Sequence, residues 1–243
     1  MKAKQLKTRK GLGLQALTPV LGCLFAALGV NSAPAAGKDA YPIMAPISQY
    51  RIASEADEIA LARSAAPASI SDGAEILVLR EQGYDVAVKG SNGFVCLVAR
   101  AWDNNFDSPE FWNPKTRGPE CLSPATVRSV LPRRLIRTKW ALAGVSKTEM
   151  QRRESAERSA GTLQPPEPGA LSYMMSKDGY LGDAAAGPWH PHVMFYVPRT
   201  EASLWGANLP GSPVASNSGG EDTTIFFIMV ANWSDGTPGP AIH

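Results

Sequence analysis

The chain has 243 residues, of which 44% are hydrophobic, with 24 basic and 22 acidic side chains and a formal net charge of +2. This composition is typical of a globular protein and excludes a disordered chain or a bundle of membrane helices. The mild net charge disfavours a nucleic-acid-binding protein, and the length suits one large domain or two small ones.

The N-terminus has the three parts of a secretory signal peptide. Residues 1–10 carry five basic side chains, residues 16–30 are mostly apolar, and Ala33 and Ala35 form a site of the A-x-A kind. Signal peptidase recognises small residues at such a site, so the sequence predicts a signal peptide over residues 1–35 that is cleaved after Ala35.

Two alternatives remain for this segment. Residues 11–30 are barely long enough to span a bilayer as an uncleaved anchor, and Gln15, Pro19 and the glycines weaken that alternative. Residues 20–23 loosely match a bacterial lipobox, but the apolar run continues for seven residues past Cys23. We therefore expect an exported chain with no stable membrane insertion once the signal is cleaved.

Charge is unevenly distributed along the expected mature chain, residues 36–243. Cleavage would leave 19 basic and 22 acidic residues, a net charge of −3. Residues 115–158 alone carry eleven basic and four acidic side chains, or +7, against −10 in the rest of the mature chain. We expect these arginines to pair with acids elsewhere in the fold; the alternative is a contact surface for an anionic lipid, an anionic polymer or an acidic partner.

Cys96 and Cys121 are the cysteines of the mature chain, an even number for an oxidising compartment. We expect them to form a disulfide, which would stabilise the fold by about 3.5 kcal/mol in the chain-entropy model. A nucleophilic cysteine is the alternative. It is disfavoured because Cys96 lies within the apolar residues 94–98, where burial makes a thiol inert.

The first half of the mature chain predicts one helix and three strands. The helix begins after the N-cap Ser54, has Asp57 at the capping-box position, and ends near Ala66 because Pro67 follows. Short glycine turns between the strands favour an antiparallel meander of residues 74–80, 84–89 and 94–102.

Residues 103–123 are predicted to form a long loop that the disulfide would pin to the preceding strand. The second half predicts three helices, over residues 124–130, 132–143 and 147–160, the last of them exposed. It also predicts strands over residues 170–176, 192–198 and 223–232, the last of them central and covered on both faces. Together these elements predict a single α+β domain, a mostly antiparallel sheet with helices packed on it.

His190 and His192 are the most chemically distinctive residues. Residues two apart in an extended segment point to the same side. The pair could therefore share a metal with a third ligand such as Asp183 or Asp222, or supply a general base near Asp235. This gives the hypothesis of a hydrolase-type enzyme with His190, His192 and Asp235 as catalytic residues. The alternative is that His192 anchors the start of a strand by packing.

The standard signatures G-x-S-x-G, S-x-x-K, H-E-x-x-H and C-x-x-C are absent from the sequence. Asp103, Asn105 and Asp107 alternate as in calcium loops, but Ser108 stands where an EF-hand requires glycine. No metal site and no obligatory cofactor is predicted.

Five of the six tryptophans, all except Trp140, lie at predicted strand ends or among Gly, Pro and Asn. Exposed aromatic rings can stack on sugar faces or on peptides, which suits a cell-wall or carbohydrate binder. The alternative is that the rings bury loop edges against the core. The candidate binding residues are Trp112, Trp189, Trp205 and Trp233.

Four runs resemble those of a group of secreted bacterial proteins with no assigned activity: residues 58–67 (EIALARSAAP), 92–98 (NGFVCLV), 172–177 (SYMMSK) and 191–196 (PHVMFY). The resemblance covers most of the mature chain and implies a bacterial exported protein of one domain, secreted or periplasmic, without implying any site residue. We expect a non-catalytic domain that binds a cell-envelope polymer or a small ligand, with the hydrolase as the alternative.

Overall fold

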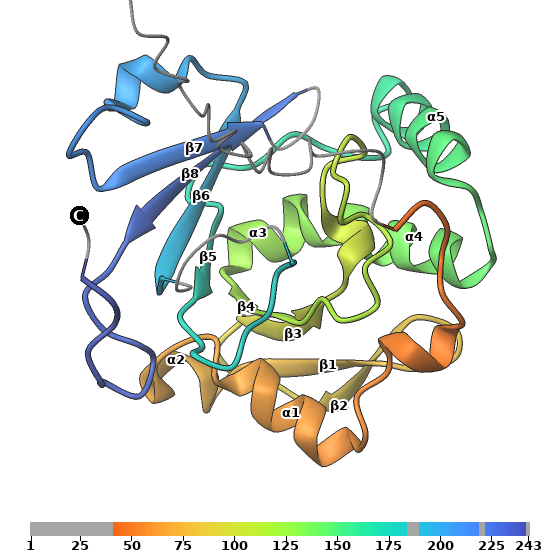
Figure 1. Cartoon of the computed structure of the whole chain (residues 1–243), viewed down its shortest axis with the longest axis horizontal. Helices are drawn as coiled ribbons and strands as arrows, with labels where there is room; N and C mark the ends of the chain where they lie inside the picture. Colours follow the sequence, from red (N-terminus) through yellow and green to blue (C-terminus); the bar gives the residue numbers. More distant parts are fainter. Residues whose placement is uncertain (1–40, 184–189, 219–221, 242–243) are drawn as a thin grey trace, which may run out of the picture. The chain divides into compact units, whose positions relative to one another are not determined.

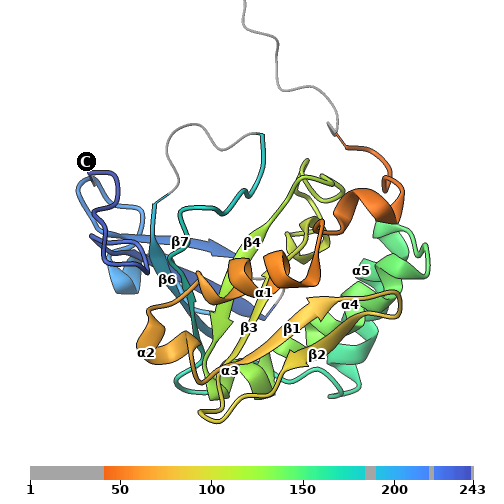
Figure 2. The ribbon, with the colours of Figure 1, turned by 90° about the horizontal axis from the view of Figure 1, so that it is seen from below.

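The computed structural model describes residues 41–183, 190–218 and 222–241. The predicted signal peptide, residues 1–35, and Trp189 lie outside these residues. In the described part of the chain, one mixed sheet of eight strands carries helices on both faces (Figures 1 and 2). The predicted α+β fold with a mostly antiparallel sheet is confirmed.

The strands lie side by side in the order β2-β1-β3-β4-β5-β6-β8-β7, and every neighbouring pair is antiparallel except β1 and β3. Their bounds are β1 Glu75–Leu79, β2 Tyr84–Val88, β3 Val95–Ala99, β4 Gly118–Leu122, β5 Leu171–Met174, β6 His192–Pro198, β7 Val214–Ser218 and β8 Thr223–Met229. The α-helices are α1 Glu55–Arg63, α2 Ala68–Ser71, α3 Pro124–Ser129, α4 Leu131–Leu142 and α5 Lys147–Ser159. Short 3₁₀ turns are η1 Ile47–Tyr50, η2 Ala101–Asp103 and η3 Ala202–Trp205.

The predicted antiparallel meander is wrong, because β3 pairs with β1 in parallel and not with β2. The link from β2 to β3 crosses the start of β1. A Cβ atom at Gly90 would lie 2.3 Å from the backbone nitrogen of Glu75, so this crossing requires glycine. The backbone N–H groups of Ser91 and Asn92 donate to the carbonyl of Gly73 at 2.8 and 3.2 Å and hold the crossing in place.

The segment of residues 103–123, predicted as a long loop, contains the strand β4. The sequence did not predict this strand because it begins with Gly118 and Pro119, two residues that are unusual inside strands. The polar strand β7 was missed as well, and it forms one edge of the sheet. Consequently β8 lies next to the edge and several of its side chains are half-buried, so the prediction that it is central and covered on both faces is wrong.

Alternate side chains of the inner strands point to opposite faces, and both faces are covered by helices. Cys96 of β3 packs in the cluster that contains Ala62 of α1, whereas its neighbour Leu97 packs with Leu131 of α4. Figure 2 shows α1 in front of the sheet and α4 behind it. This double cover explains why β3 is a continuous apolar run.

Three predicted helix starts are confirmed, because a serine hydroxyl accepts a backbone N–H three residues ahead at Ser54, Ser123 and Ser146. The expectation that the last helix lies exposed is wrong in part, since Met150 and Glu154 anchor one side of α5 in the interior. Within residues 41–183, 190–218 and 222–241, no helix is long and apolar enough to cross a membrane.

Candidate functional site

The most exposed aromatic feature of the described chain is centred on Trp205, the last residue of η3. Its ring stacks on that of Phe226 in β8, with centroids 4.2 Å apart and an interplanar angle of 9°. Phe195 of β6 lies beside them, with its centroid 6.3 Å from that of Trp205. One side of the indole is therefore supported by the sheet, while 41% of the residue remains exposed.

Two leucines of the same segment add to this feature. Leu204 is 76% exposed and Leu209 is 57% exposed. We call Trp205, with Phe195 and Phe226 beneath it, together with the exposed Leu204 and Leu209 of the same segment, the aromatic surface. A group of large apolar side chains in one exposed segment is a typical mark of a binding site.

The backbone around Trp205 is fixed by local hydrogen bonds. Gly206 adopts a left-handed conformation (φ +63°) that ends η3, and its N–H donates to the carbonyl of Ser203 at 3.1 Å. Asn208 is also left-handed (φ +60°), and its side chain accepts from the N–H of Ser216 in β7 at 2.9 Å. These bonds fix the backbone next to Trp205, and a fixed backbone would lower the conformational entropy lost if a ligand bound there.

Trp112 and Trp233, the other candidate tryptophans within the described ranges, make no ring contact with Trp205. Trp112 is only 4% exposed and packs edge-on against Phe111, at 4.7 Å between centroids, in a separate core cluster. Trp233 is half-buried in the loop after β8, where its backbone N–H donates to the carbonyl of Thr237 at 2.9 Å. Trp205 is thus the candidate that presents a ring to solvent on a supported platform.

The first candidate catalytic residue, His192, begins β6 and is only 4% exposed. Its Nδ1 lies 2.9 Å from the carbonyl oxygen of His190, and its ring packs edge-on against Phe227 at 5.5 Å. Burial lowers the pKa of His192, and the bond to His190 only partly offsets that effect. His192 is therefore a neutral, enclosed side chain, as the packing alternative predicts, while His190 is half-buried.

Asp235, the proposed acidic partner, is exposed in the loop after β8. Its carboxylate accepts from Lys177 at 2.6 Å and from the hydroxyl and N–H of Thr237 at 2.6 and 3.0 Å. The bond from Lys177, followed by those from Thr237, lowers the pKa of Asp235. A carboxylate so engaged is a poor general base at neutral pH.

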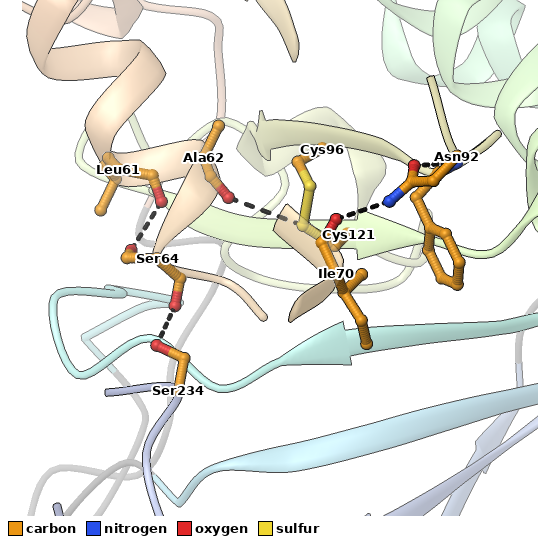
Figure 3. The surroundings of a disulfide bond; sticks show 9 residues. Leu61, Ala62, Ser64, Ile70, Asn92, Cys96, Cys121 and Ser234 are labelled. Atoms are coloured by element: carbon orange, nitrogen blue, oxygen red, sulfur yellow. Dashed lines mark hydrogen bonds between the residues drawn. A yellow bond between two sulfur atoms is a disulfide. The ribbon is translucent and has the colours of Figure 1, made fainter. Parts of the chain in front are cut away.

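The predicted disulfide between Cys96 and Cys121 is confirmed (Figure 3). The two residues lie directly opposite each other on β3 and β4 and are fully buried beneath α1. The Sγ of Cys121 lies 3.8 Å from the carbonyl oxygen of Ala62. The bridge is a structural element of the core, and neither sulfur is placed to act as a nucleophile.

Several basic side chains of residues 115–158 are buried and paired with carboxylates in the interior of the fold. The guanidinium of Arg134 in α4 pairs with Glu120 of β4, and the hydroxyl of Tyr196 donates to the same carboxylate at 2.7 Å. Arg137 pairs with Glu154 of α5. The expectation that these arginines pair within the fold is confirmed for Arg134 and Arg137, so their part of the segment offers no free cationic face.

A second polar cluster was not found from the sequence. The carboxylate of Asp183 accepts from the hydroxyls of Tyr41 and Tyr180 and from the ammonium of Lys115 at 3.1 Å. Bonds from Tyr180, Tyr41 and Lys115 lower the pKa of Asp183 to about 2, and the pKa values of the three donors are raised. All four groups stay in their ordinary ionisation states at neutral pH, so the cluster is suited to fastening loops and not to proton transfer.

No group of three or more metal-ligating side chains occurs within the described ranges. Comparison of the chain with models of protein families, with curated proteins and with solved structures found no match in any of the three.

Proposed function

We propose that the protein is an exported, non-catalytic domain that binds a carbohydrate polymer of the cell envelope, with Trp205 as its stacking platform. The observation that carries this proposal is the geometry of Trp205, which is 41% exposed while one ring face rests on Phe226. A fixed, solvent-facing indole offers a rigid apolar plane with an N–H donor at its edge.

The neighbours of Trp205 support a sugar ligand. Sugar rings carry apolar C–H faces bordered by hydroxyls, and so they match a surface that is apolar at its centre and polar at its rim. Leu204 and Leu209 of the same segment are also exposed apolar side chains, and the exposed Ser203 lies next to Leu204 in the chain. An extended polymer can engage such an open surface without needing a deep pocket.

The burial of the Cys96–Cys121 disulfide supports an oxidising destination, as expected for a secreted or periplasmic protein. The basic and apolar pattern of residues 1–35, typical of a secretory signal peptide, also supports export to such a compartment. An envelope polymer is the abundant macromolecule that a protein exported from a bacterium meets.

The hydrolase alternative receives no comparable support from the described residues. His192 is enclosed and neutral, and Asp235 is paired with Lys177. Hydrolysis by a general base needs an accessible group within hydrogen-bond reach of its substrate. Binding by the aromatic surface requires no such group.

Co-sedimentation with purified insoluble peptidoglycan tests the proposal. The exported protein should pellet with the polymer, and Trp205→Ala should weaken this binding about tenfold or more, as the loss of a central aromatic anchor does. Ile43→Ala is the matched control, because Ile43 is a large apolar side chain that is 77% exposed outside the aromatic surface. Binding that is absent, or that is unaffected by Trp205→Ala, would contradict the proposal.

A further inference from the structure

The two strands nearest the aromatic surface, β5 and β6, have one buried face and one partly exposed face. Along both strands, up to Val197, buried residues alternate with half-buried ones. Side chains of a strand point alternately to the two faces of the sheet, and residues paired across strands share a face. The half-buried positions therefore form one face, and all of them are apolar or aromatic: Leu171, Tyr173, Val193, Phe195 and Val197.

This partly exposed face continues the aromatic surface. The ring of Trp205 lies beside Phe195 and stacks on Phe226, and these two phenylalanines are paired across β6 and β8. The helix on the same side of the sheet, α1, packs on β1, β3 and β4. Figure 2 shows β6 and β7 to one side of that helix. The face of an antiparallel sheet that meets water is normally polar, so an apolar one indicates a contact surface.

Aromatic rings recur along this face and form a row. Phe94, just before β3, is half-buried, and its ring centroid lies 6.3 Å from that of Tyr173 in β5. Phe195 lies at the same distance from Trp205. Tyr173 and Phe195 are diagonal neighbours, because Phe195 is paired with Leu171, two positions before Tyr173. Diagonal neighbours are within reach of aromatic side chains.

We propose that the carbohydrate polymer bound at Trp205 continues along this row, with Phe195, Tyr173 and Phe94 as further subsites for successive sugar units. This inference rests on the proposed function and adds the length and direction of the bound chain. Four strand spacings separate Phe226 in β8 from Phe94 beside β3, which corresponds to about 19 Å. A disaccharide is shorter than this row, so a full complement of contacts requires several sugar units.

The chemistry of the row favours a sugar polymer over an apolar occupant. A flat ring stacks on the C–H face of a sugar and leaves the sugar hydroxyls in water, so partly exposed rings suffice. Trp205 and Tyr173 also carry a polar group at the ring edge, an indole N–H and a hydroxyl, which suit the hydroxyls that border a sugar ring. The separation of 6.3 Å between neighbouring rings is close to the length of one sugar unit in an extended polymer.

The dependence of affinity on chain length tests this inference. In calorimetric titration, soluble peptidoglycan glycan strands of four disaccharide units should bind the folded protein at least about tenfold more tightly than a single disaccharide does. Only the longer strand reaches the subsites beyond Trp205. Equal affinity for the two lengths would overturn the inference and leave the proposed function standing. Absence of binding by both ligands would overturn the two together.

Tyr173→Leu separates ring stacking from general apolar contact. The substitution keeps an apolar side chain on the sheet but removes the ring, so the affinity for the four-unit strand should fall about threefold to tenfold. Phe106→Leu is the matched control, because Phe106 is also a half-buried ring but lies in a separate core cluster. Circular dichroism confirms that each variant is folded before titration.

An acyl chain, an apolar peptide or a second copy of the chain would accept leucine in place of Tyr173. Unchanged affinity of the folded Tyr173→Leu variant for the four-unit strand would therefore overturn the inference. If Trp205→Ala still weakened binding in the same titrations, the proposed function would stand with Trp205 as an isolated platform.

Discussion

Trp205 and Phe226 are 21 positions apart in the chain, yet their rings lie parallel at 4.2 Å between centroids. The stack links a short 3₁₀ turn to β8 and sets the direction in which the indole faces solvent. Aromatic pairs of this kind contribute about 0.5–1.5 kcal/mol beyond their burial. Phe226, which is fully buried, is therefore a positioning residue for the aromatic surface.

Phe226→Leu should weaken carbohydrate binding although Phe226 itself is not exposed. The substitution keeps an apolar side chain but removes the ring under Trp205, so the indole must be immobilised when ligand binds. That cost corresponds to a loss of affinity of about threefold to tenfold. Nitrogen-15 relaxation of the Trp205 indole N–H should report faster motion. Phe106→Leu, which alters the pair of Phe106 and Phe111 in a separate core cluster, is the control and should change neither quantity.

Asn208 covers part of the edge of β7, because its side-chain oxygen accepts from the backbone N–H of Ser216 at 2.9 Å and its Nδ2 donates to the Ser216 carbonyl at 3.5 Å. Asn208→Gly keeps the left-handed backbone but exposes this edge, so we expect concentration-dependent self-association in sedimentation velocity. Asn208→Asp keeps the acceptor for the Ser216 N–H and should sediment like the unchanged protein. Identical sedimentation of the glycine variant would show that the edge is blocked by something else.

Glu154 should be one of the most costly acidic residues to neutralise. Burial opposes its ionisation, but the charge and hydrogen bond of Arg137 outweigh burial and lower its pKa to about 2. Glu154→Gln leaves buried guanidinium groups without their carboxylate and should reduce the free energy of unfolding in urea by about 3–5 kcal/mol. Glu149→Gln, in an exposed cluster with Arg152 and Arg153, should cost less than about 1 kcal/mol. Similar losses in both variants would contradict this account.

Sequence patterns predicted features that depend on neighbouring residues, such as helix N-caps. They did not predict features that depend on contacts between distant residues. Ser54, Ser123 and Ser146 could be identified as N-caps because a cap depends on residues within one turn. The even cysteine count predicted the disulfide. The parallel pairing of β1 with β3 depends instead on a crossing at Gly90 that no periodicity reveals.

The candidate site shows the same limit. The sequence identified Trp205 as one of four candidate tryptophans but could not tell it from Trp112, because exposure depends on which elements pack nearby. Its partner Phe226 lies within an apolar run that predicted only a buried strand. The Asp183 cluster joins three loops, so its members share no motif.

Stability should fall as the pH decreases below about 6.5, in part because of His192. Burial lowers the pKa of His192 in the folded state, so the unfolded chain takes up a proton first. The stability contribution is complete above the unfolded pKa and is lost as the pH falls through the folded one. Urea unfolding between pH 7 and 5 should show a shallower decrease for His192→Asn. Glu149 titrates in a lower window, from the usual 4.5 down to a pKa of about 2 in the folded state, so the control Glu149→Gln should leave this slope unchanged.

Removal of the disulfide should destabilise the fold without abolishing the β3–β4 pairing. The bridge closes a segment with a sequence separation of 25, which corresponds to about 3.5 kcal/mol in the chain-entropy model. The double variant Cys96→Ala/Cys121→Ala should unfold at a lower urea concentration, with the free energy of unfolding reduced by about 3.5 kcal/mol. Thiol titration of unfolded, unreduced residues 36–243 should detect no free thiol, and two free thiols would refute the bridge.

The central claim is that Trp205 is the platform of a carbohydrate-binding surface. It is tested most directly by calorimetric titration of soluble peptidoglycan glycan strands into the protein and into its Trp205→Ala and Ile43→Ala variants. The account predicts saturable binding to the unchanged protein and to Ile43→Ala, and an affinity at least about tenfold lower for Trp205→Ala. Equal affinities in all three proteins, or no binding heat in any of them, would contradict it.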